Sequence, residues 1–180
     1  LTRTRAEMAR RGIDTLIVID PSNMNWLSGY DGWSFYTHQC VVVPSEGEMF
    51  WYGREMDAAG AVRTVYLADE QVLSYPDYYV QNPDLHPMTL LAQMMANRGL
   101  NRGTIGIEMD NYYVSAAAFR AVKSGLSNAR FQDATLLVNW LRGEKSPTEL
   151  DYMRKAGRIV EEMHKAILRV ADVGVPKNVI

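Results

Sequence analysis

The residues best suited to contact a small molecule lie between Ser22 and Cys40. This stretch interleaves aromatic rings with amide, carboxyl, hydroxyl and imidazole groups: Trp26, Tyr30, Trp33, Phe35 and Tyr36 alternate irregularly with Asn23, Asn25, Asp31, Thr37, His38 and Gln39. Gly29 and Gly32 interrupt it, and no helical or strand period separates polar from apolar residues. The mixture favours a turn that presents flat apolar faces and hydrogen-bonding edges to a ligand. The alternative is a short helix and a half-buried strand whose aromatic rings fill the core.

Groups for metal, nucleophilic or acid–base chemistry are few and widely spaced. His38, His86 and His164 are far apart in sequence, and no HExxH, HxH or CxxC motif is present, so we expect no metal site. A histidine just before a strand, as His38 is, is more often a hydrogen-bonded structural group than a ligand-binding one. Cys40 begins an apolar strand and is expected to be an inert core thiol. Motifs of nucleotide-binding loops and of serine hydrolases are also absent.

The best candidate pair of carboxylates is Glu108 and Asp110, which follow a short apolar strand. Alternate residues on an extended strand share a face, so these two carboxyl groups could act together. The simpler interpretation is a cap for the next helix and a surface charge. The residues alone therefore predict no complete active site, and no catalytic residue is assigned.

The composition is that of an ordinary globular domain without an electrostatic preference for polyanions. Of the 180 residues, 47% are apolar and 22% are charged, the formal net charge is −2 and the isoelectric point is near 5.9. Nucleic acid and anionic membranes are therefore not expected as partners, and no apolar run approaches the ~20 residues of a membrane-spanning helix. A single cysteine excludes an internal disulfide and indicates a reducing, cytoplasmic location.

The aromatic stretch is positioned by a strand and a helix near the N-terminus. Residues 1–11 have the pattern of an amphipathic helix that Gly12 ends. Ile13–Asp20 contains a continuous apolar run rich in β-branched residues, which is typical of a strand covered on both faces. Asp20 is a suitable helix N-cap and is followed by a proline, which predicts a short helix to Leu27.

The middle of the chain predicts a hairpin over residues 39–53, a helix over Arg54–Tyr66 and then an irregular segment. The side of this helix that we expect to be buried consists of Met56, Ala59, Val62 and Tyr66. Three prolines between Ser74 and Pro87 exclude a regular element there. That aromatic-rich segment is either a functional loop or a plain surface connection.

The remaining elements alternate between helix and strand. Helices are predicted over Thr89–Arg98, Ser115–Lys123 and Ala134–Leu141, and strands over Thr104–Glu108 and Ala129–Phe131. Strands and helices in this order indicate one mixed β-sheet with helices on both faces. The predicted fold class is therefore α/β.

The clearest boundary in the chain precedes its longest predicted helix. Ser146 and Glu149 match a capping box, and Pro147 occupies the first helical position. The apolar residues beyond them recur at helical spacing to about Val173.

We therefore divide the chain into an α/β domain, residues 1–142, and a linker with a long helix, residues 143–180. Because the chain begins at Leu1 without a methionine and stops soon after that helix, we expect it to be part of a longer protein.

Two segments resemble the creatinase/prolidase family. RGEKSPTELDYMRKA, from Arg142 to Ala156, is similar to the segment that leads into the pita-bread catalytic domain of these metallopeptidases (M24-type). LIVIDPSNMNWLSGYDG, from Leu16 to Gly32, resembles the first strand and the N-(W/Y)-(L/Y)-(S/T)-G motif of their N-terminal domain. The resemblance covers nearly the whole chain and implies an N-terminal domain followed by the first helix of a catalytic domain.

Within this family the chain most resembles the branch of ectoine hydrolases, which open the ring of a compatible solute. The segments that carry this resemblance are WLSGYDGWSFYTHQC, WYGREMDAAGA, YPDYYVQ and GIEMDNYY. The enzyme alternative is an Xaa-Pro dipeptidase or aminopeptidase. On its own, the chain would act as a non-catalytic dimerisation or small-molecule binding module.

The resemblance also implies where the chemistry lies. The family's metal ligands, two Asp, one His and two Glu, belong to the catalytic domain, which would begin near Ser146. None of their motifs is in this chain, so Mn²⁺, Co²⁺ or Zn²⁺ is expected only in that further domain. The 180 residues alone are expected to bind no catalytic metal and to hydrolyse nothing.

The family's N-terminal domain packs in dimers and contributes to the rim of a catalytic pocket, which implies a homodimer and a small-molecule substrate. The implied substrate-rim residues are Trp33, Phe35, Tyr36, Thr37 and His38. The implied interface residues are Tyr30, Asp31, Tyr78, Tyr79 and His164. Creatinases have an arginine in the neighbourhood of Phe35–His38, and its absence here argues against creatine, whose carboxylate needs a cation.

Overall fold

The computed structural model describes residues 1–180, which divide into two compact units, Leu1–Leu141 and Arg142–Ile180. The strands of the first unit are β1 (Thr15–Val18), β2 (Cys40–Pro44), β3 (Phe50–Arg54), β4 (Val72–Tyr75), β5 (Gly103–Ile107) and β6 (Ala129–Asp133). Its helices are α1 (Thr2–Arg11), α2 (Pro21–Ser28), α3 (Glu55–Thr64), α4 (Pro87–Asn97), α5 (Ala116–Gly125) and α6 (Leu137–Gly143), with 3₁₀ turns η1 (Asp69–Gln71) and η2 (Asp77–Tyr79).

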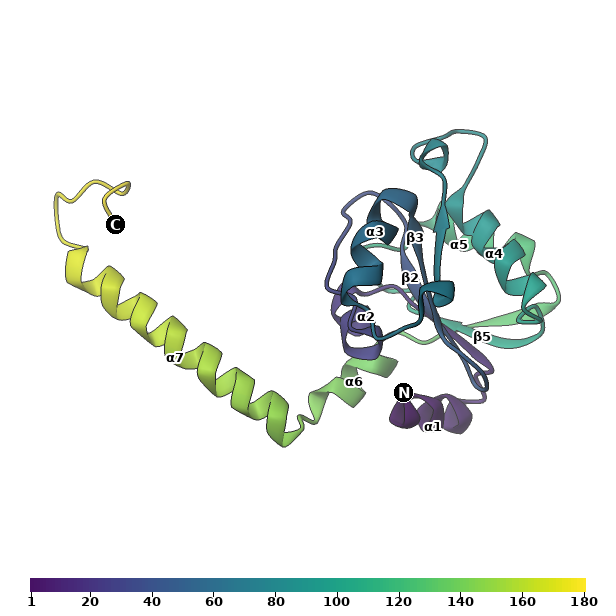
Figure 1. Cartoon of the computed structure of the whole chain (residues 1–180), viewed down its shortest axis with the longest axis horizontal. Coiled ribbons are helices and arrows are strands. Elements are labelled where there is room, and N and C mark those ends of the chain that lie inside the picture. Colours follow the sequence, from purple (N-terminus) through teal and green to yellow (C-terminus); the bar gives the residue numbers. More distant parts are fainter. The chain divides into compact units, whose positions relative to one another are not determined.

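All six strands form one mixed sheet in the order β4-β3-β2-β1-β5-β6 (Figure 1). Only β2 runs antiparallel to its neighbours, whereas β3 pairs with β4, β1 with β5, and β5 with β6 in parallel. Five strands therefore end at the same edge of the sheet, where β2 begins. We call this the carboxyl edge. The predicted α/β class, with a mixed sheet flanked by helices, is confirmed.

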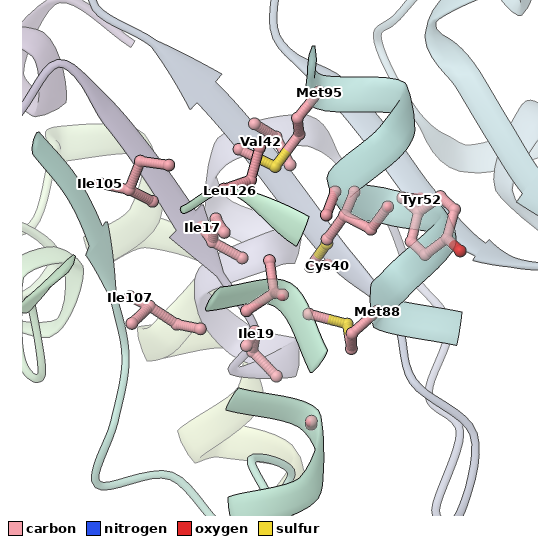
Figure 2. Close-up of a cluster of buried hydrophobic side chains, with 14 of the residues drawn as sticks. Ile17, Ile19, Cys40, Val42, Tyr52, Met88, Met95, Ile105, Ile107 and Leu126 are labelled. Carbon is pink, nitrogen blue, oxygen red and sulfur yellow. The ribbon is translucent and has the colours of Figure 1, made fainter. Parts of the chain in front are cut away.

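Helices cover both faces of the sheet, which explains why every residue of β1 is buried and why Leu16–Val18 are all apolar. Ile17 and Ile19 point into the core beneath α4 and α5, shown in Figure 2. Leu16 and Val18 point into the opposite core, against α1, α2, α3 and α6. Because successive strand residues face opposite sides, a strand between two helical layers needs apolar side chains at every position.

Helix α3 forms where it was predicted but buries a different side. Met56 is 61% exposed and Tyr66 is 85% exposed, and Ala59 and Val62 also face solvent. The buried contact is made by Ala61, with Ala58 and Val65 packed beside it. Small side chains let the helix approach the sheet closely, so its larger apolar residues face outward. The predicted inner face was wrong.

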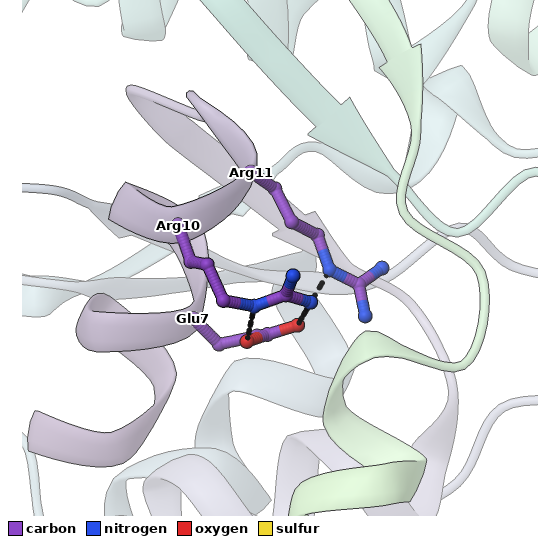
Figure 3. Close-up of polar contacts among 3 residues, drawn as sticks. All are labelled: Glu7, Arg10 and Arg11. Carbon is purple, nitrogen blue, oxygen red and sulfur yellow. Dashed lines mark hydrogen bonds and ion pairs between the residues drawn. The ribbon is translucent and has the colours of Figure 1, made fainter.

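The N-terminal helix α1 ends as predicted, at Gly12 in the left-handed conformation. On its surface the Glu7 carboxylate accepts hydrogen bonds from Arg10 Nε and Nη2, and from Arg11 Nε, all at 2.7 Å (Figure 3). These two arginines lower the pKa of Glu7 to about 2. Both cations also lie in the last turn, where they complement the helix dipole.

The predicted start and end of α2 are also confirmed. Asp20 Oδ1 accepts a hydrogen bond from the Asn23 N–H at 3.0 Å, and Pro21 occupies the first helical position. Gly29 ends the helix with φ of 79°, and a Cβ there would lie 2.8 Å from the Tyr66 ring. The chain therefore turns sharply into the aromatic stretch at a position that only glycine fits.

The second unit contains one long helix, α7 (Pro147–Val170), with the predicted capping box. Ser146 Oγ accepts from the Glu149 N–H at 3.2 Å, and Glu149 Oε2 accepts from the Ser146 N–H at 2.7 Å. Ion pairs Asp151–Lys155 and Glu161–Lys165 follow at 2.8 Å each. No helix of either unit combines the length and the apolar character needed to cross a membrane.

A buried carboxylate joins β5 to the start of α2. Glu108, directly after β5, is 3% exposed, and its Oε2 accepts from the N–H groups of Ile19 and Asp20, both at 2.7 Å. Its Oε1 accepts from Asn23 Nδ2 at 2.6 Å, and the same amide donates to Asn139 Oδ1 of α6 at 2.8 Å. Burial raises the pKa of Glu108, while these hydrogen bonds act in the opposite direction. The carboxylate is a structural tie and not half of a catalytic pair.

Replacing Glu108 by Ala should lower the free energy of unfolding by about 3 kcal/mol, because buried donors on β1 and α2 lose their acceptor. Urea titration of the 180-residue chain measures the change. Asp110→Ala is the matched control, because this neighbouring carboxylate is exposed and should change stability by less than about 0.5 kcal/mol. Equal effects of the two substitutions would contradict the structural role.

Candidate functional site

Loops that are far apart in sequence meet at the carboxyl edge of the sheet. The aromatic stretch leads from α2 to the start of β2, the segment 76–87 follows the end of β4, and residues 108–115 follow the end of β5. In open α/β sheets, ligands typically bind in crevices outside the carboxyl ends of the strands. The sequence placed candidate residues in all three of these loops without showing that they meet.

A pocket of about 210 Å³ lies between the aromatic stretch and the segment 76–87. From the aromatic stretch it includes Tyr36, Thr37 and His38, all proposed from the sequence. The other side is formed by Tyr75, Tyr79, Val80, Gln81, Asn82, Leu85, His86 and Pro87. No residue that lines this pocket carries a carboxylate, lysine or arginine side chain, so the site suits a ligand held by rings and neutral hydrogen-bonding groups.

Three polar contacts fix the walls of the pocket to the sheet. Tyr75 Oη donates to the His38 carbonyl oxygen at 2.9 Å, and Tyr52 Oη donates to the Pro87 carbonyl oxygen at 2.7 Å. Arg54 Nε donates to Asp77 Oδ1 at 2.7 Å, which holds η2. Both tyrosines are buried in the sheet, so the segment 76–87 is tied at both ends although it lacks a long regular element.

Two imidazole rings stack in the pocket wall. The centroids of His38 and His86 are 4.9 Å apart, with their planes tilted by 31°. Burial, and secondarily the neighbouring His86, lowers the pKa of His38 to about 4. Burial also lowers the pKa of His86. Both rings are therefore neutral at pH 7, which differs from the arginine that a carboxylate ligand would need at this position.

Thr37 and Tyr36 differ in exposure and in role: Thr37 is buried in the loop, whereas Tyr36 is exposed. Thr37 is 8% exposed, and its Oγ1 lies 2.5 Å from Ser34 Oγ and 3.3 Å from Asp57 Oδ2, so the hydroxyl mainly orders the loop. Tyr36 is 59% exposed and presents its ring at the pocket mouth. Within the pocket, Tyr36 and His38 are the residues from the aromatic stretch best placed to contact a ligand.

Trp33 and Phe35 belong to a separate aromatic patch, which we define as Trp33, Phe35, Tyr112 and Tyr113. Trp33 Nε1 donates to Tyr113 Oη at 2.6 Å. The Phe35 ring lies 5.9 Å from Trp33 and 6.0 Å from Tyr112, centroid to centroid. Trp33 remains 59% exposed and Phe35 57% exposed. The aromatic stretch thus divides between a pocket and an exposed patch.

The residues suggested for an interface lie in different environments. Tyr78 is 64% exposed, Tyr79 lines the pocket, and Asp31 lines an open hollow of about 400 Å³ with Trp33. His164 is exposed on α7, in the second unit.

Tyr30 is mostly buried, although it lines the base of the same hollow, and its role in an interface stays a prediction. It is 4% exposed, its ring centroid is 5.1 Å from that of Trp51, and its Oη donates to Gln39 Oε1 at 2.8 Å. Both its ring and its hydroxyl are satisfied within the core, where burial raises the pKa of the phenol.

Sequence reasoning missed several residues of the site: Tyr75, Asn82, His86, Tyr112 and Tyr113. His86 precedes a proline at the start of a helix, a pattern that signals an N-cap. The pairing of Tyr113 with Trp33, by contrast, joins residues far apart in the chain and has no local signal.

The chain contains no group of three or more His, Cys, Asp or Glu side chains arranged to hold a metal ion. Cys40 is fully buried in the sheet, and burial raises the pKa of its thiol, as expected for an inert core residue.

Acidification should destabilise the wild-type chain relative to His38→Gln. Because the pKa of His38 is lowered in the folded state, the unfolded chain takes up this proton first as the pH falls below about 6.5. The difference should reach on the order of 3 kcal/mol near pH 4 and vanish near pH 7. Urea titrations at about pH 7, 5.5 and 4.5 measure it. His164→Gln, an exposed position, is the control, and a pH-independent difference for His38→Gln would contradict the expectation.

The family model described as Creatinase/Prolidase N-terminal domain matches residues 1–143. The chain is 56% identical over 179 residues to an ectoine hydrolase from Halomonas elongata, covering 99% of this chain and 45% of that protein. It thus spans less than half of the length of this curated relative.

Solved structures of low sequence identity share the fold. An Xaa-Pro dipeptidase from Bacillus anthracis superposes with a TM-score of 0.76 at 17% identity, over 97% of this chain and 43% of that one. A Creatine_N superfamily domain of a dipeptidase from Streptococcus thermophilus gives 0.62 at 19% identity, over 77% of this chain and 95% of that one. With the family model matching most of its length, this chain belongs to the creatinase/prolidase family, through the N-terminal domain formed by residues 1–143.

Proposed function

We propose that this chain acts as the N-terminal domain of a hydrolase that opens the ring of ectoine. The observation that carries the proposal is the 56% identity to an ectoine hydrolase over 179 residues, a matched length that includes both walls of the pocket. The likeness to Xaa-Pro dipeptidases, at 17% identity, supports only a common fold.

The pocket has the chemistry that a small cyclic zwitterion requires. Tyrosine rings supply flat apolar and cation–π faces, while His38, Asn82 and Tyr36 supply neutral donors and acceptors. In this proposal the chain's own residues orient the ring and exclude water from one side of it. Bond cleavage, with any divalent metal, belongs to a catalytic domain of which α7 would be the first helix.

The proposed assembly is a cytoplasmic homodimer in which the carboxyl edge of one subunit forms part of the rim of a catalytic pocket. The exposed aromatic patch supports this role, because exposed rings that contact one another commonly mark a surface covered by a partner or ligand. Sedimentation equilibrium of the full-length protein tests the dimer, and a monomer at micromolar concentration would contradict it.

Ectoine and an Xaa-Pro dipeptide should be compared as substrates of the full-length protein, each with and without Mn²⁺ or Co²⁺. We expect ring opening of ectoine, measured by chromatography of the product, and no release of proline. Proline release without ectoine turnover would contradict the proposal and favour a peptidase. Titration of ectoine into the 180-residue chain by calorimetry then tests whether the chain binds the substrate without the catalytic domain.

Trp33→Ala in the full-length protein should raise KM or lower kcat by about tenfold, because an exposed ring at a substrate rim contributes roughly 1–2 kcal/mol of contact. The melting temperature should change little, since the side chain is 59% exposed. Tyr66→Ala is the control, because its ring is 85% exposed and lines none of the hollows described above. Unchanged activity per folded molecule, with a lowered melting temperature, would make Trp33 a structural residue.

A further inference from the structure

His86 is the N-cap of α4 and at the same time part of the pocket wall. Its Nδ1 accepts a hydrogen bond from the Met88 N–H at 3.1 Å. Pro87 has no N–H, so Met88 supplies the first N–H of the helix, and this hydrogen bond meets the usual role of an N-cap. Because Nδ1 accepts, the neutral imidazole carries its proton on Nε2.

A protonated His86 cannot keep this arrangement. Imidazolium donates from both nitrogens, so Nδ1 could no longer accept from Met88. The cation would also face the positive end of α4 and the His38 ring at 4.9 Å. No hydrogen bond engages either ring nitrogen of His38, whose carbonyl oxygen alone is held, by Tyr75. The stacked His86 ring therefore helps to orient the His38 ring.

No neighbouring group compensates a positive charge on this pair. From β4 and η2 the pocket presents Tyr75 and Tyr79, and from the aromatic stretch it presents Tyr36. The ionised groups on the adjoining elements include Arg54 and Asp77, which pair with each other. They also include Asp57, which contacts Thr37, and Asp84 in the loop before His86. None of these carboxylates lines the pocket.

We propose that His86 is the positioning residue of this pocket. As a neutral cap it holds the His38 ring against the wall, and proton uptake by the pair releases both rings, so that the pocket loses the shape that binds the ligand. Only the identity of the ligand rests on the proposed function. The site would then bind its ligand in the neutral range and lose it on acidification, by loss of shape and not by a change in ligand charge.

The decisive experiment is an NMR titration of the imidazole resonances in the 180-residue chain. The chain has three histidines, and the exposed His164 serves as the internal reference, with single His→Asn variants for assignment. We expect both pocket histidines to titrate below the ordinary imidazole pKa of about 6.5, and the Met88 amide resonance to move with the His86 midpoint. Titration of His86 at that ordinary value, or a Met88 amide resonance that does not shift with the His86 midpoint, would overturn the proposal.

His86→Asn separates positioning from capping. Asparagine can still accept from the Met88 N–H, so α4 should keep its start, but the stacking ring is lost. The His38 midpoint should then rise by about one pH unit, and the Met88 amide should stop responding to pH in that range. An unchanged His38 midpoint would contradict the positioning role. If this variant does not fold, the Met88 response of the wild-type chain still decides the question.

Ectoine kinetics of the full-length protein test whether the stacking of His38 on His86 affects substrate binding. The wild-type KM should rise at least about tenfold as the pH falls through the two pocket midpoints, while in His86→Asn the KM should be higher at neutral pH and flatter with pH. Tyr66→Ala, whose ring is 85% exposed and lines none of the hollows, should behave like wild type. An intact NMR response without any ectoine turnover would refute the proposed substrate and leave the positioning role standing, whereas parallel KM profiles of wild type and His86→Asn would refute the positioning role.

Discussion

The carboxyl edge depends on a buried carboxylate whose two oxygens both accept hydrogen bonds. Glu108 accepts from two consecutive backbone N–H groups at the end of β1 and from Asn23 on α2, so it fixes the direction in which the chain leaves the sheet. A buried carboxylate is costly unless it is hydrogen-bonded, and here both oxygens have donors. Helix α2 leads directly into residues 29–40, so the position of these residues relative to β5 follows from this tie.

The pocket has a different origin from the cores on the two faces of the sheet. The cores pack by apolar area, whereas the pocket walls are held by tyrosine hydroxyls that reach from β3 and β4 to backbone carbonyls of the neighbouring loops. Such contacts order an irregular segment without filling the space beside it. A hollow with neutral polar groups therefore remains at the carboxyl edge, between elements that are themselves firmly packed.

Much of the fold was predictable because its signals are local. The apolar run of β1, the caps Asp20 and Ser146, and the hairpin over residues 39–53 all appear where the sequence indicated them. The prediction failed where packing between elements decides the outcome. Helix α3 turned Ala58 and Ala61 toward the sheet and left Met56 exposed, because small side chains allow a close approach.

The sequence by itself determined the α/β class and the family resemblance, and it singled out the stretch Ser22–Cys40, since these depend on residue types and short spacings. Only the tertiary structure decided that this stretch divides into two sites, that His38 stacks on His86 from a different loop, and that Glu108 is a tie and not an acid catalyst. The reason is physical: hydrogen bonds and ring contacts between residues about 50 or 90 positions apart arise from the order of strands in the sheet, which no local pattern encodes.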